Sequence, residues 1–251
     1  MYPILFEYKL ITIGSYGLLL GMAFYLGFLL AEREFKIKGL DPDIAYKLLI
    51  AIIPSAIIGA KLFHIIDNFN EFLASPKDML LSGAGLSVYG GFLLSFIVAL
   101  IIIKKEKQSI LQIFDIASPS MALGYGIGRL GCHVSGDGCY GIVSDSIFAV
   151  SYPGGIVPTT AAVYPTPLFE SALSFIFFFI LLQLRTKEIK TGSLFFIYLA
   201  LNGTARFLVE FIRLNPVINS GLTQAQFVAL FFIITGLAGL ALLNRQVQKR
   251  E

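Results

Sequence analysis

The chain alternates between long apolar stretches and short polar connections. Seven apolar stretches carry few charges, and they cover residues 11–31, 44–66, 86–103, 110–130, 165–184, 192–212 and 222–243. A helix needs about 20 mostly apolar residues to cross the hydrocarbon core of a bilayer. The pattern therefore predicts an all-α polytopic bundle of seven transmembrane helices, forming a single integral membrane domain over residues 1–251.

Composition supports a membrane protein and excludes other classes. Hydrophobic residues make up 56% of the chain, charged residues only 14%, and the mean hydropathy is +0.79. These values lie outside the range of soluble globular domains. The net charge of +3 is too small for a nucleic-acid footprint, so we expect no nucleic-acid partner.

The positions of the basic residues predict an orientation. Thirteen of the nineteen lysines and arginines lie in segments 32–47, 104–107, 185–190 and 245–250, which follow alternate apolar stretches. Cytoplasmic connections of membrane proteins are enriched in these residues. We therefore expect the N-terminus outside, the C-terminus in the cytoplasm, and a loop-rich extracytoplasmic cap over residues 132–163, between the fourth and fifth helices.

Several charged residues lie where a membrane helix should be apolar. Arg129, Arg206 and Arg213 fall near the predicted outer helix ends, as does Lys61, and Glu210 lies four residues after Arg206. A charge at membrane depth is costly unless it is paired or reaches water, so such residues indicate function. Arginine clusters bind phosphate through forked hydrogen bonds, which favours a phospholipid head group as ligand.

A structural interpretation of the same residues stays open. Arg206 and Glu210 could form an internal ion pair, while Arg213 reaches the interface by snorkelling. Glu170 lies near the start of the fifth apolar stretch, where an acid complements the helix dipole. It could equally orient Arg206.

The segment 124–141 combines glycines with reactive groups. Cys132, His133, Asp137 and Cys139 lie within eight positions. Their spacing matches no strong zinc pattern, and four ligands so close in one loop would be strained, so we expect neither a metal nor another cofactor. A disulfide between the two cysteines is an alternative, and so is a nucleophilic Cys132 assisted by His133.

In order along nearly the whole chain, short motifs resemble those of the prolipoprotein diacylglyceryl transferase family. The most specific is RFLVEFIR at 206–213, which is similar to R-F-x-V-E-F-x-R of that family. The segment GRLGCHVSGD at 128–137 resembles G-R-x-G-N-F-x-N-G-E. Further similar segments are GAKL at 59–62, LSVYGG at 86–91, YPTPLFE at 164–170 and GLTQAQ at 221–226.

The resemblance implies a seven-helix enzyme of the bacterial cytoplasmic (inner) membrane. Such an enzyme moves the diacylglyceryl group of phosphatidylglycerol to the lipobox cysteine in the signal-peptide region of a prolipoprotein, and releases glycerol phosphate. Arg129 and Arg206 would grip the phosphate, while Glu210 would hold an arginine or the glycerol. Further substrate-binding residues implied by the matching motifs are Lys61, Gly90, Gly91, Gly131, Ser135, Gly136, Asp137, Glu170, Arg213 and Gln226.

Some positions depart from the family pattern. The histidine that precedes Gly-Gly in the family is Tyr89 here, and tyrosine, with a pKa of about 10, is a poor base at neutral pH. Cys132, Ser135 and Asp137 replace two asparagines and a glutamate. We hypothesise that His133 supplies the missing imidazole, which makes Tyr89 and His133 candidate catalytic residues.

The departures keep two other functions open. One is a divergent relative that uses the same lipid donor with a different acceptor. The other is a non-catalytic protein that binds or transports phospholipid. A transporter would be expected to show two related halves with interrupted helices in matching places, and the sequence shows no such symmetry.

Overall fold

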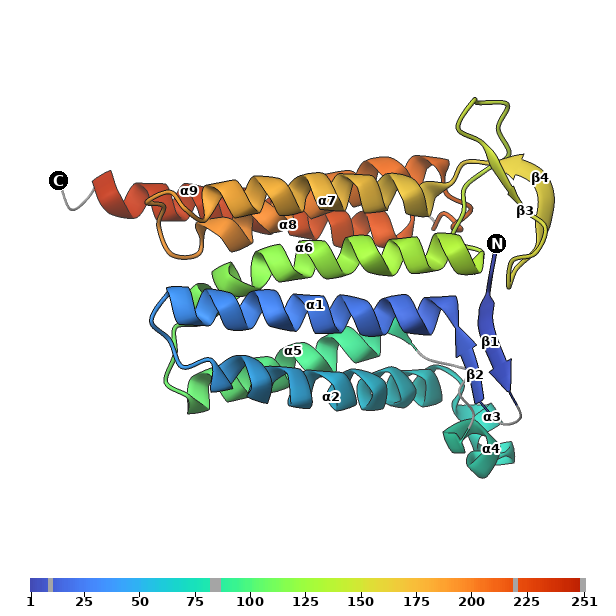
Figure 1. Cartoon of the computed structure of the whole chain (residues 1–251), viewed down its shortest axis with the longest axis horizontal. Helices are drawn as coiled ribbons and strands as arrows, with labels where there is room; N and C mark the ends of the chain where they lie inside the picture. Colours follow the sequence, from blue (N-terminus) through green and yellow to red (C-terminus); the bar gives the residue numbers. More distant parts are fainter. Residues whose placement is uncertain (9–10, 82–86, 219–220, 249–251) are drawn as a thin grey trace. The chain divides into compact units, whose positions relative to one another are not determined.

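The protein is mostly helical, with two short antiparallel hairpins (Figure 1). The computed structural model describes residues 1–8, 11–81, 87–218 and 221–248. The chain divides into two compact units. The first contains Met1–Ala31 and Phe114–Glu251, and the second contains Glu32–Ile113.

Membrane-crossing helices dominate the described residues. Six of them are long and apolar enough to span a bilayer, which confirms an all-α polytopic membrane protein. These six are α1 (Ser15–Ile37), α2 (Asp43–Asp67), α6 (Ile110–Ser135), α7 (Thr166–Leu184), α8 (Ser193–Val209) with the 3-10 turn η1 (Glu210–Ile212), and α9 (Gln224–Gln248). In the place of the third expected span lies α5 (Val88–Lys105), an apolar helix of 18 residues. The start expected for that span, residue 86, lies outside the described residues, so a total of seven spans and their orientation stay predictions.

In the first unit, α6 and α7 are joined by buried hydroxyl groups. Ser171 Oγ donates to the carbonyl of Gly126 at 2.8 Å, and Ser174 Oγ donates to that of Ala122 at 2.7 Å. A Cβ at Gly126 would lie 3.0 Å from the Phe175 ring, so the glycine lets α7 approach. In a bilayer the hydrophobic effect does not drive helices together. They associate through close packing at small residues and through hydrogen bonds between helices.

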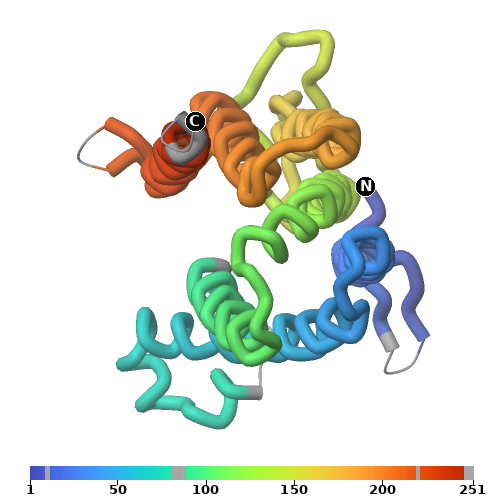
Figure 2. Tube along the Cα trace, turned by 90° about the vertical axis from the view of Figure 1, so that its left-hand side faces the viewer, coloured from blue at the N-terminus to red at the C-terminus, as the bar shows by residue number. Residues whose placement is uncertain are grey.

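In the same unit α8 packs against α7, and α9 packs against α8, as the view along the helices in Figure 2 shows. Gly203 of α8 faces α9, where an added Cβ would lie 2.8 Å from the carbonyl oxygen of Ala229. Asp115 of α6 caps the first turn of α8, because its carboxylate accepts hydrogen bonds from Gly192 N at 2.5 Å and Phe195 N at 2.8 Å. The carboxylate thus satisfies two of the unpaired N–H groups of a helix start.

The second unit is organised around the close approach of α2 and α5. A Cβ at Gly91 would lie 2.8 Å from the carbonyl oxygen of Ala56, and side chains at Gly59 and Gly90 would collide with each other's backbone. Lys47 and Glu106 form an ion pair of 2.7 Å near one end of this unit. Two short helices, α3 (Phe69–Ala74) and α4 (Pro76–Leu81), occupy most of the polar segment between α2 and α5.

The ends of three helices differ clearly from the expected bounds, and one of them is α9, which continues to Gln248 instead of ending at 243. Residues 11–14 form strand β2 (Ile11–Gly14), paired with β1 (Ile4–Tyr8), so α1 starts only at Ser15. It continues to Ile37, because Glu32 and Lys36 are good helix formers that pair at i,i+4 over 2.6 Å. Helix α6 continues five residues beyond the expected end at 130, to Ser135.

The longer α6 changes the local structure of the predicted cap. Cys132, His133 and Ser135 lie on the last turns of a helix, and only the residues after Ser135 form the connection. The second hairpin, β3 (Val150–Tyr152) with β4 (Thr159–Val163), lies within that connection. In the first unit, both hairpins lie at the end where α6 finishes, and α9 finishes at the opposite end (Figure 1).

Candidate functional site

Five charged side chains from separate elements of the first unit meet at one end of its helices. They are Arg129 of α6, Glu170 of α7, Arg206 of α8, Glu210 of η1 and Arg213 just after η1. The three arginines and two glutamates are linked by ion pairs of 2.7 to 3.9 Å. With all five ionised, the cluster carries one net positive charge.

Glu170 is the acceptor shared by all three arginines. Arg206 Nη1 donates to its Oε1 at 2.7 Å, and Arg213 Nη1 donates to its Oε2 at 3.0 Å. Arg129 Nε lies 3.3 Å from Oε2, while the Tyr125 hydroxyl donates to Oε1 at 2.9 Å and accepts from Arg129 Nη2 at 3.0 Å. The Glu170 side chain is only 2% exposed, so this carboxylate depends on these partners for its charge.

Glu210 forms the second anionic point of the cluster. Its Oε2 faces Arg206 Nη2 at 2.8 Å, an ion pair that is not aligned as a hydrogen bond. Its Oε1 accepts hydrogen bonds from Thr223 Oγ1 at 2.9 Å and Asn215 Nδ2 at 2.5 Å. Arg206 therefore bridges two carboxylates through its two terminal nitrogens, which fixes the plane of its guanidinium group.

Backbone contacts place the two sides of this cluster next to each other. Gly141 N donates to the carbonyl of Tyr164 at 2.8 Å, and Ile142 N donates to that of Ile212 at 2.9 Å. A side chain at Gly141 would collide with the Ile212 carbonyl oxygen, so only glycine permits this approach. The connection after α6 thereby holds the start of α7, with Glu170, against the end of η1, with Arg213.

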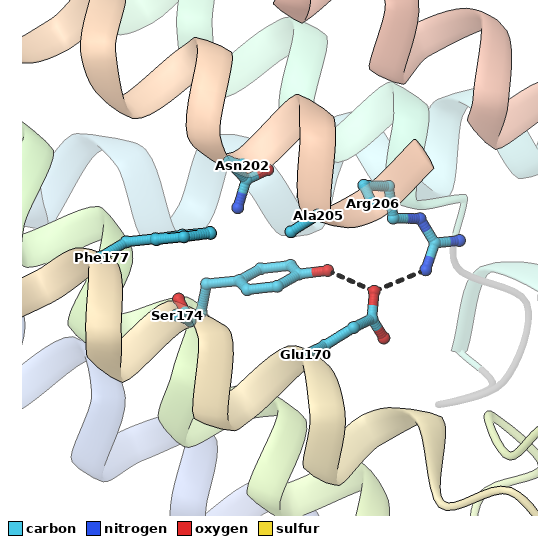
Figure 3. A pocket seen from close by; sticks show the side chains of 7 residues that line it. Glu170, Ser174, Phe177, Asn202, Ala205 and Arg206 are labelled. Atoms are coloured by element: carbon cyan, nitrogen blue, oxygen red, sulfur yellow. Dashed lines mark hydrogen bonds and ion pairs between the residues drawn. The ribbon is translucent and has the colours of Figure 1, made fainter. Parts of the chain in front are cut away.

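A small pocket of about 190 Å³, its open mouth included, lies beside Glu170 and Arg206 (Figure 3). Its lining comes from α6, α7 and α8 and includes Tyr125, Ser174, Phe177, Asn202 and Ala205. Charged groups occupy one end, whereas Phe177 lies at the other end with the polar side chains of Ser174 and Asn202. An amphipathic pocket of this kind suits a ligand with an anionic group next to a carbon skeleton.

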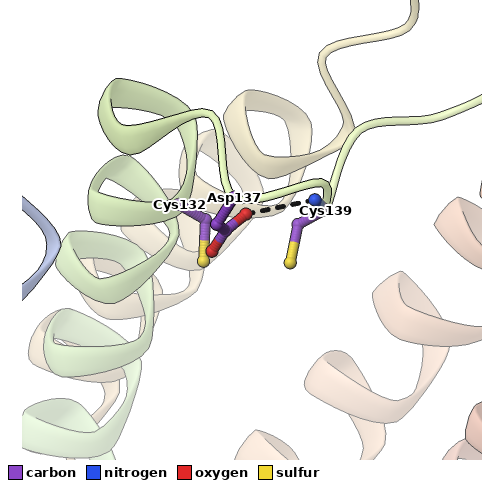
Figure 4. Close-up of side chains that lie close together, drawn as sticks. All are labelled: Cys132, Asp137 and Cys139. Atoms are coloured by element: carbon purple, nitrogen blue, oxygen red, sulfur yellow. Dashed lines mark hydrogen bonds between the residues drawn. The ribbon is translucent and has the colours of Figure 1, made fainter. Parts of the chain in front are cut away.

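A second cluster lies at the end of α6 and in the loop that follows it. The sulfur atoms of Cys132 and Cys139 and a carboxylate oxygen of Asp137 all lie within 4.8 Å of one another (Figure 4). Both cysteines are free. The pKa of the Cys139 thiol is lowered to about 7, chiefly because the Cys132 thiol donates a hydrogen bond to its sulfur.

His133 contacts the second hairpin. Its Nδ1 shares a hydrogen bond of 2.9 Å with the hydroxyl of Tyr152 on β3, and the two rings meet edge to face. Burial raises the pKa of Tyr152 to about 12, so the hydroxyl stays protonated at neutral pH. The catalytic role expected for His133 stays a prediction.

Four of the other predicted residues shape the backbone near the end of α6. Ser135 Oγ donates to the carbonyl of Cys132 at 3.2 Å, and Gly136 adopts a positive φ of 60°, where an added Cβ would meet Gly155 at 2.7 Å. Asp137 Oδ1 accepts from Cys139 N at 3.1 Å. A Cβ at Gly131 would lie 3.2 Å from the ring of Tyr16 on α1.

Gln226 lies at the start of α9, where it stabilises the helix end. Its Oε1 accepts from Thr223 N at 2.9 Å, while its own N–H donates to Thr223 Oγ1 at 3.2 Å. This reciprocal pattern is a capping box. Since the same Thr223 hydroxyl donates to Glu210, Gln226 supports the arginine cluster through Thr223. Direct contact of Gln226 with a substrate stays a prediction.

Lys61, Tyr89, Gly90 and Gly91 belong to the second unit. Gly90 and Gly91 are buried against α2, where they permit the close helix approach described above. Lys61 is half-buried on α2, and Tyr89 is 52% exposed on α5. Their roles toward a substrate stay predictions.

The sequence did not predict three polar residues that bond to the two glutamates of the arginine cluster: Tyr125, Thr223 and Asn215. Tyr125 could have been found, because it precedes Arg129 by four residues and so lies on the same helix face. Thr223 has the signal of a Thr-x-x-Gln capping box. Asn215 lies in an irregular segment after η1, and no local pattern predicts that it reaches Glu210.

The whole chain is similar in sequence to known proteins. The family model described as "Prolipoprotein diacylglyceryl transferase" matches residues 3–242. Three similar proteins are named phosphatidylglycerol--prolipoprotein diacylglyceryl transferase. That of Leptospira interrogans is 35% identical, covering 81% of this chain and 72% of its own length. That of Clostridium tetani is 31% identical over 94% of this chain and 96% of its own. That of Halalkalibacterium halodurans is 31% identical over 90% and 81%. The chain belongs to the prolipoprotein diacylglyceryl transferase family.

Proposed function

We propose that this protein transfers the diacylglyceryl group of phosphatidylglycerol to the cysteine thiol of a prolipoprotein in the bacterial inner membrane. The observation that carries the proposal is the cluster of three arginines, held by two buried carboxylates among membrane helices. Phosphatidylglycerol and prolipoprotein are the substrates that the relatives' names give. The net positive charge of the cluster suits the phosphate of that lipid.

The proposed reaction exchanges one bond for another at the glyceryl carbon. The sulfur of the acceptor cysteine forms a bond to the carbon that carries the phosphate, and the bond between this carbon and the phosphate oxygen breaks. The electron pair leaves with glycerol phosphate. The thiol gives up its proton before the attack, since the thiolate is the nucleophile, and this proton ends on the released phosphate or in water. The departing phosphate gains negative charge, so cations placed next to it lower the barrier.

Arg129 and Arg206 are suited to receive this charge. Their side chains are 18% and 19% exposed, so a phosphate oxygen can approach them, whereas Arg213 is only 7% exposed. We assign Arg213 to the support of Glu170. Glu170 and Glu210 then act as positioning residues, which hold the guanidinium planes before the lipid arrives.

The small pocket beside Arg206 supports a position for the reacting carbon. Its volume of about 190 Å³ includes the open mouth, so it has no room for acyl chains. In this proposal the glyceryl carbon next to the phosphate lies at the mouth of the pocket, beside Arg206. The acyl chains would remain in the surrounding bilayer, from which both membrane-anchored substrates enter.

The test compares two arginine variants in detergent with phosphatidylglycerol and a synthetic lipobox peptide. Arg206→Ala is expected to lower kcat/KM by about 100-fold to 1,000-fold, the usual cost of removing one donor to a developing anion. Arg245→Ala removes an exposed arginine near the end of α9 and should leave the rate within twofold. Equal effects of the two variants would contradict the assignment. Phospholipid binding without an adduct would instead favour a non-catalytic role.

A further inference from the structure

Cys132, Asp137 and Cys139 bring two sulfur atoms and one carboxylate to a single point. The three ligand atoms lie within 4.8 Å of one another. In a tetrahedral zinc site with Zn–S bonds of about 2.3 Å, two sulfur ligands lie about 3.8 Å apart. The largest distance allowed among the three ligand atoms, 4.8 Å, therefore exceeds the sulfur–sulfur distance in a zinc-filled site by only about 1 Å. Contrary to the expectation from the sequence spacing, we propose that these three side chains, without His133, form a binding site for a divalent zinc-like metal ion.

Each ligand residue is held in place by a different contact. Cys132 lies on α6, and its carbonyl accepts a hydrogen bond from Gly136 N at 3.0 Å, which continues the helical pattern to the end of α6. Asp137 is oriented by Cys139 N, and the carbonyl of Cys139 accepts from Thr166 Oγ1 at 2.6 Å. Gly136 and Gly138 have positive φ values of 60° and 88°, which permit the tight loop that connects the three ligands. These contacts preorganise the three ligands, which lowers the cost of binding an ion.

The chemistry of the three ligands selects the ion. Two thiolates favour a borderline-soft ion such as Zn²⁺ over Mg²⁺ or Ca²⁺, which prefer all-oxygen sites. Binding converts both thiols to thiolates and releases two protons. With the Asp137 carboxylate, the filled site carries one net negative charge and has a fourth position for water. A disulfide explains the arrangement less well, since it needs no carboxylate and requires the sulfurs to approach to about 2.05 Å.

The location of the site indicates a structural role for the metal. Cys132 lies three residues after Arg129 on α6. Cys139 lies two residues before Gly141, where the connection contacts both the start of α7 and the end of η1. A metal between them would fasten the connection to α6 next to the arginine cluster. Asp137 is also a substrate-binding residue by family resemblance, but the reaction proposed above uses none of the three ligands, so this inference does not rest on that reaction.

The test uses the full-length protein, freed of any affinity tag, reduced, and cleared of metal with a chelator. Titration with Co²⁺ is expected to give one ion per chain, with the sulfur-to-cobalt charge-transfer absorption and the visible bands of a tetrahedral site. Zn²⁺ should displace it and raise the melting temperature. Cys132→Ser and Cys139→Ser should each weaken binding by more than about 100-fold, beyond the usual effect of losing an outer-shell partner.

Two further variants make the result specific. Asp137→Asn should weaken binding while leaving the thiols intact, whereas His133→Ala should bind Co²⁺ like the native chain, because its Nδ1 contacts Tyr152 instead. Absence of the thiolate absorption in protein with two titratable thiols would overturn the proposal. So would binding that persists unchanged in both serine variants, which would be adventitious. A Cys132–Cys139 disulfide in protein purified without reductant would overturn it as well.

Discussion

Glu170→Gln tests the arrangement of the arginine cluster most sharply. The substitution keeps the size of the side chain and one oxygen acceptor, but it removes the negative charge that three arginines share. It also directs an amide N–H₂ toward a guanidinium group, so two donors face each other. The net charge of the cluster rises from one to two positive charges in a site where Glu170 is 2% exposed.

The expected cost follows from the burial of that carboxylate. Loss of one partner from a buried ion pair costs about 3–5 kcal/mol. For a chain of this size, each kcal/mol lowers the melting temperature by about 2–4 °C, so the variant should melt about 6–20 °C lower. The transfer rate should also fall about 100-fold, because a misplacement of about 1 Å has that effect.

Circular dichroism in detergent, followed during heating, measures the change without tryptophan, which the chain lacks. Glu188→Gln is the matched control, because Glu188 is exposed in the segment between α7 and α8. It should shift the melting temperature by no more than about 2 °C, as surface substitutions stay within about 0.5 kcal/mol. A Glu170→Gln protein that melts like this control and keeps its activity would refute the reasoning.

Three further predictions concern other parts of the fold. Asp115→Ala should destabilise the protein by about 1–3 kcal/mol in thermal melts, because two N–H groups at the start of α8 lose their acceptor. In chelated, reduced protein, alkylation of Cys139 by iodoacetamide should rise with a midpoint near pH 7, because only the thiolate reacts. Cys132→Ala removes the hydrogen-bond donor and should move this midpoint up; an unchanged profile in peptide mass spectra would contradict the assigned cause. Gly59→Ala should cost about 1–3 kcal/mol through its collision with α5, whereas Gly17→Ala, in open space, should not lower the melting temperature.

The sequence predicted the fold class and the charged residues that meet, because both depend on strong signals. Long apolar stretches indicate membrane helices, and a charge within them stands out. The approach of Arg206 to Glu210 also follows from their i,i+4 spacing. For Glu170 the sequence left two roles open, complementing the helix dipole or orienting Arg206. Only the packing of α7 against α8 brings it to Arg206.

Features that depend on tertiary contacts were not predicted. The periodicity of α6 gave no reason to extend the helix to Ser135, since glycine and β-branched residues lower helix propensity there. The four residues 11–14 are apolar enough for a membrane helix, yet they pair with β1. The convergence of Cys132, Asp137 and Cys139 depends on two glycines with positive φ, which the spacing alone does not reveal.

The measurement that tests the central claim most directly follows the reaction itself. Native protein is incubated with phosphatidylglycerol and a lipobox peptide, and in parallel with the same peptide in which serine replaces the cysteine. The account predicts a diacylglyceryl mass increase on the cysteine peptide alone, with one glycerol phosphate released for each peptide modified. A protein that binds phosphatidylglycerol but yields no adduct and no glycerol phosphate, or that modifies both peptides equally, would contradict it.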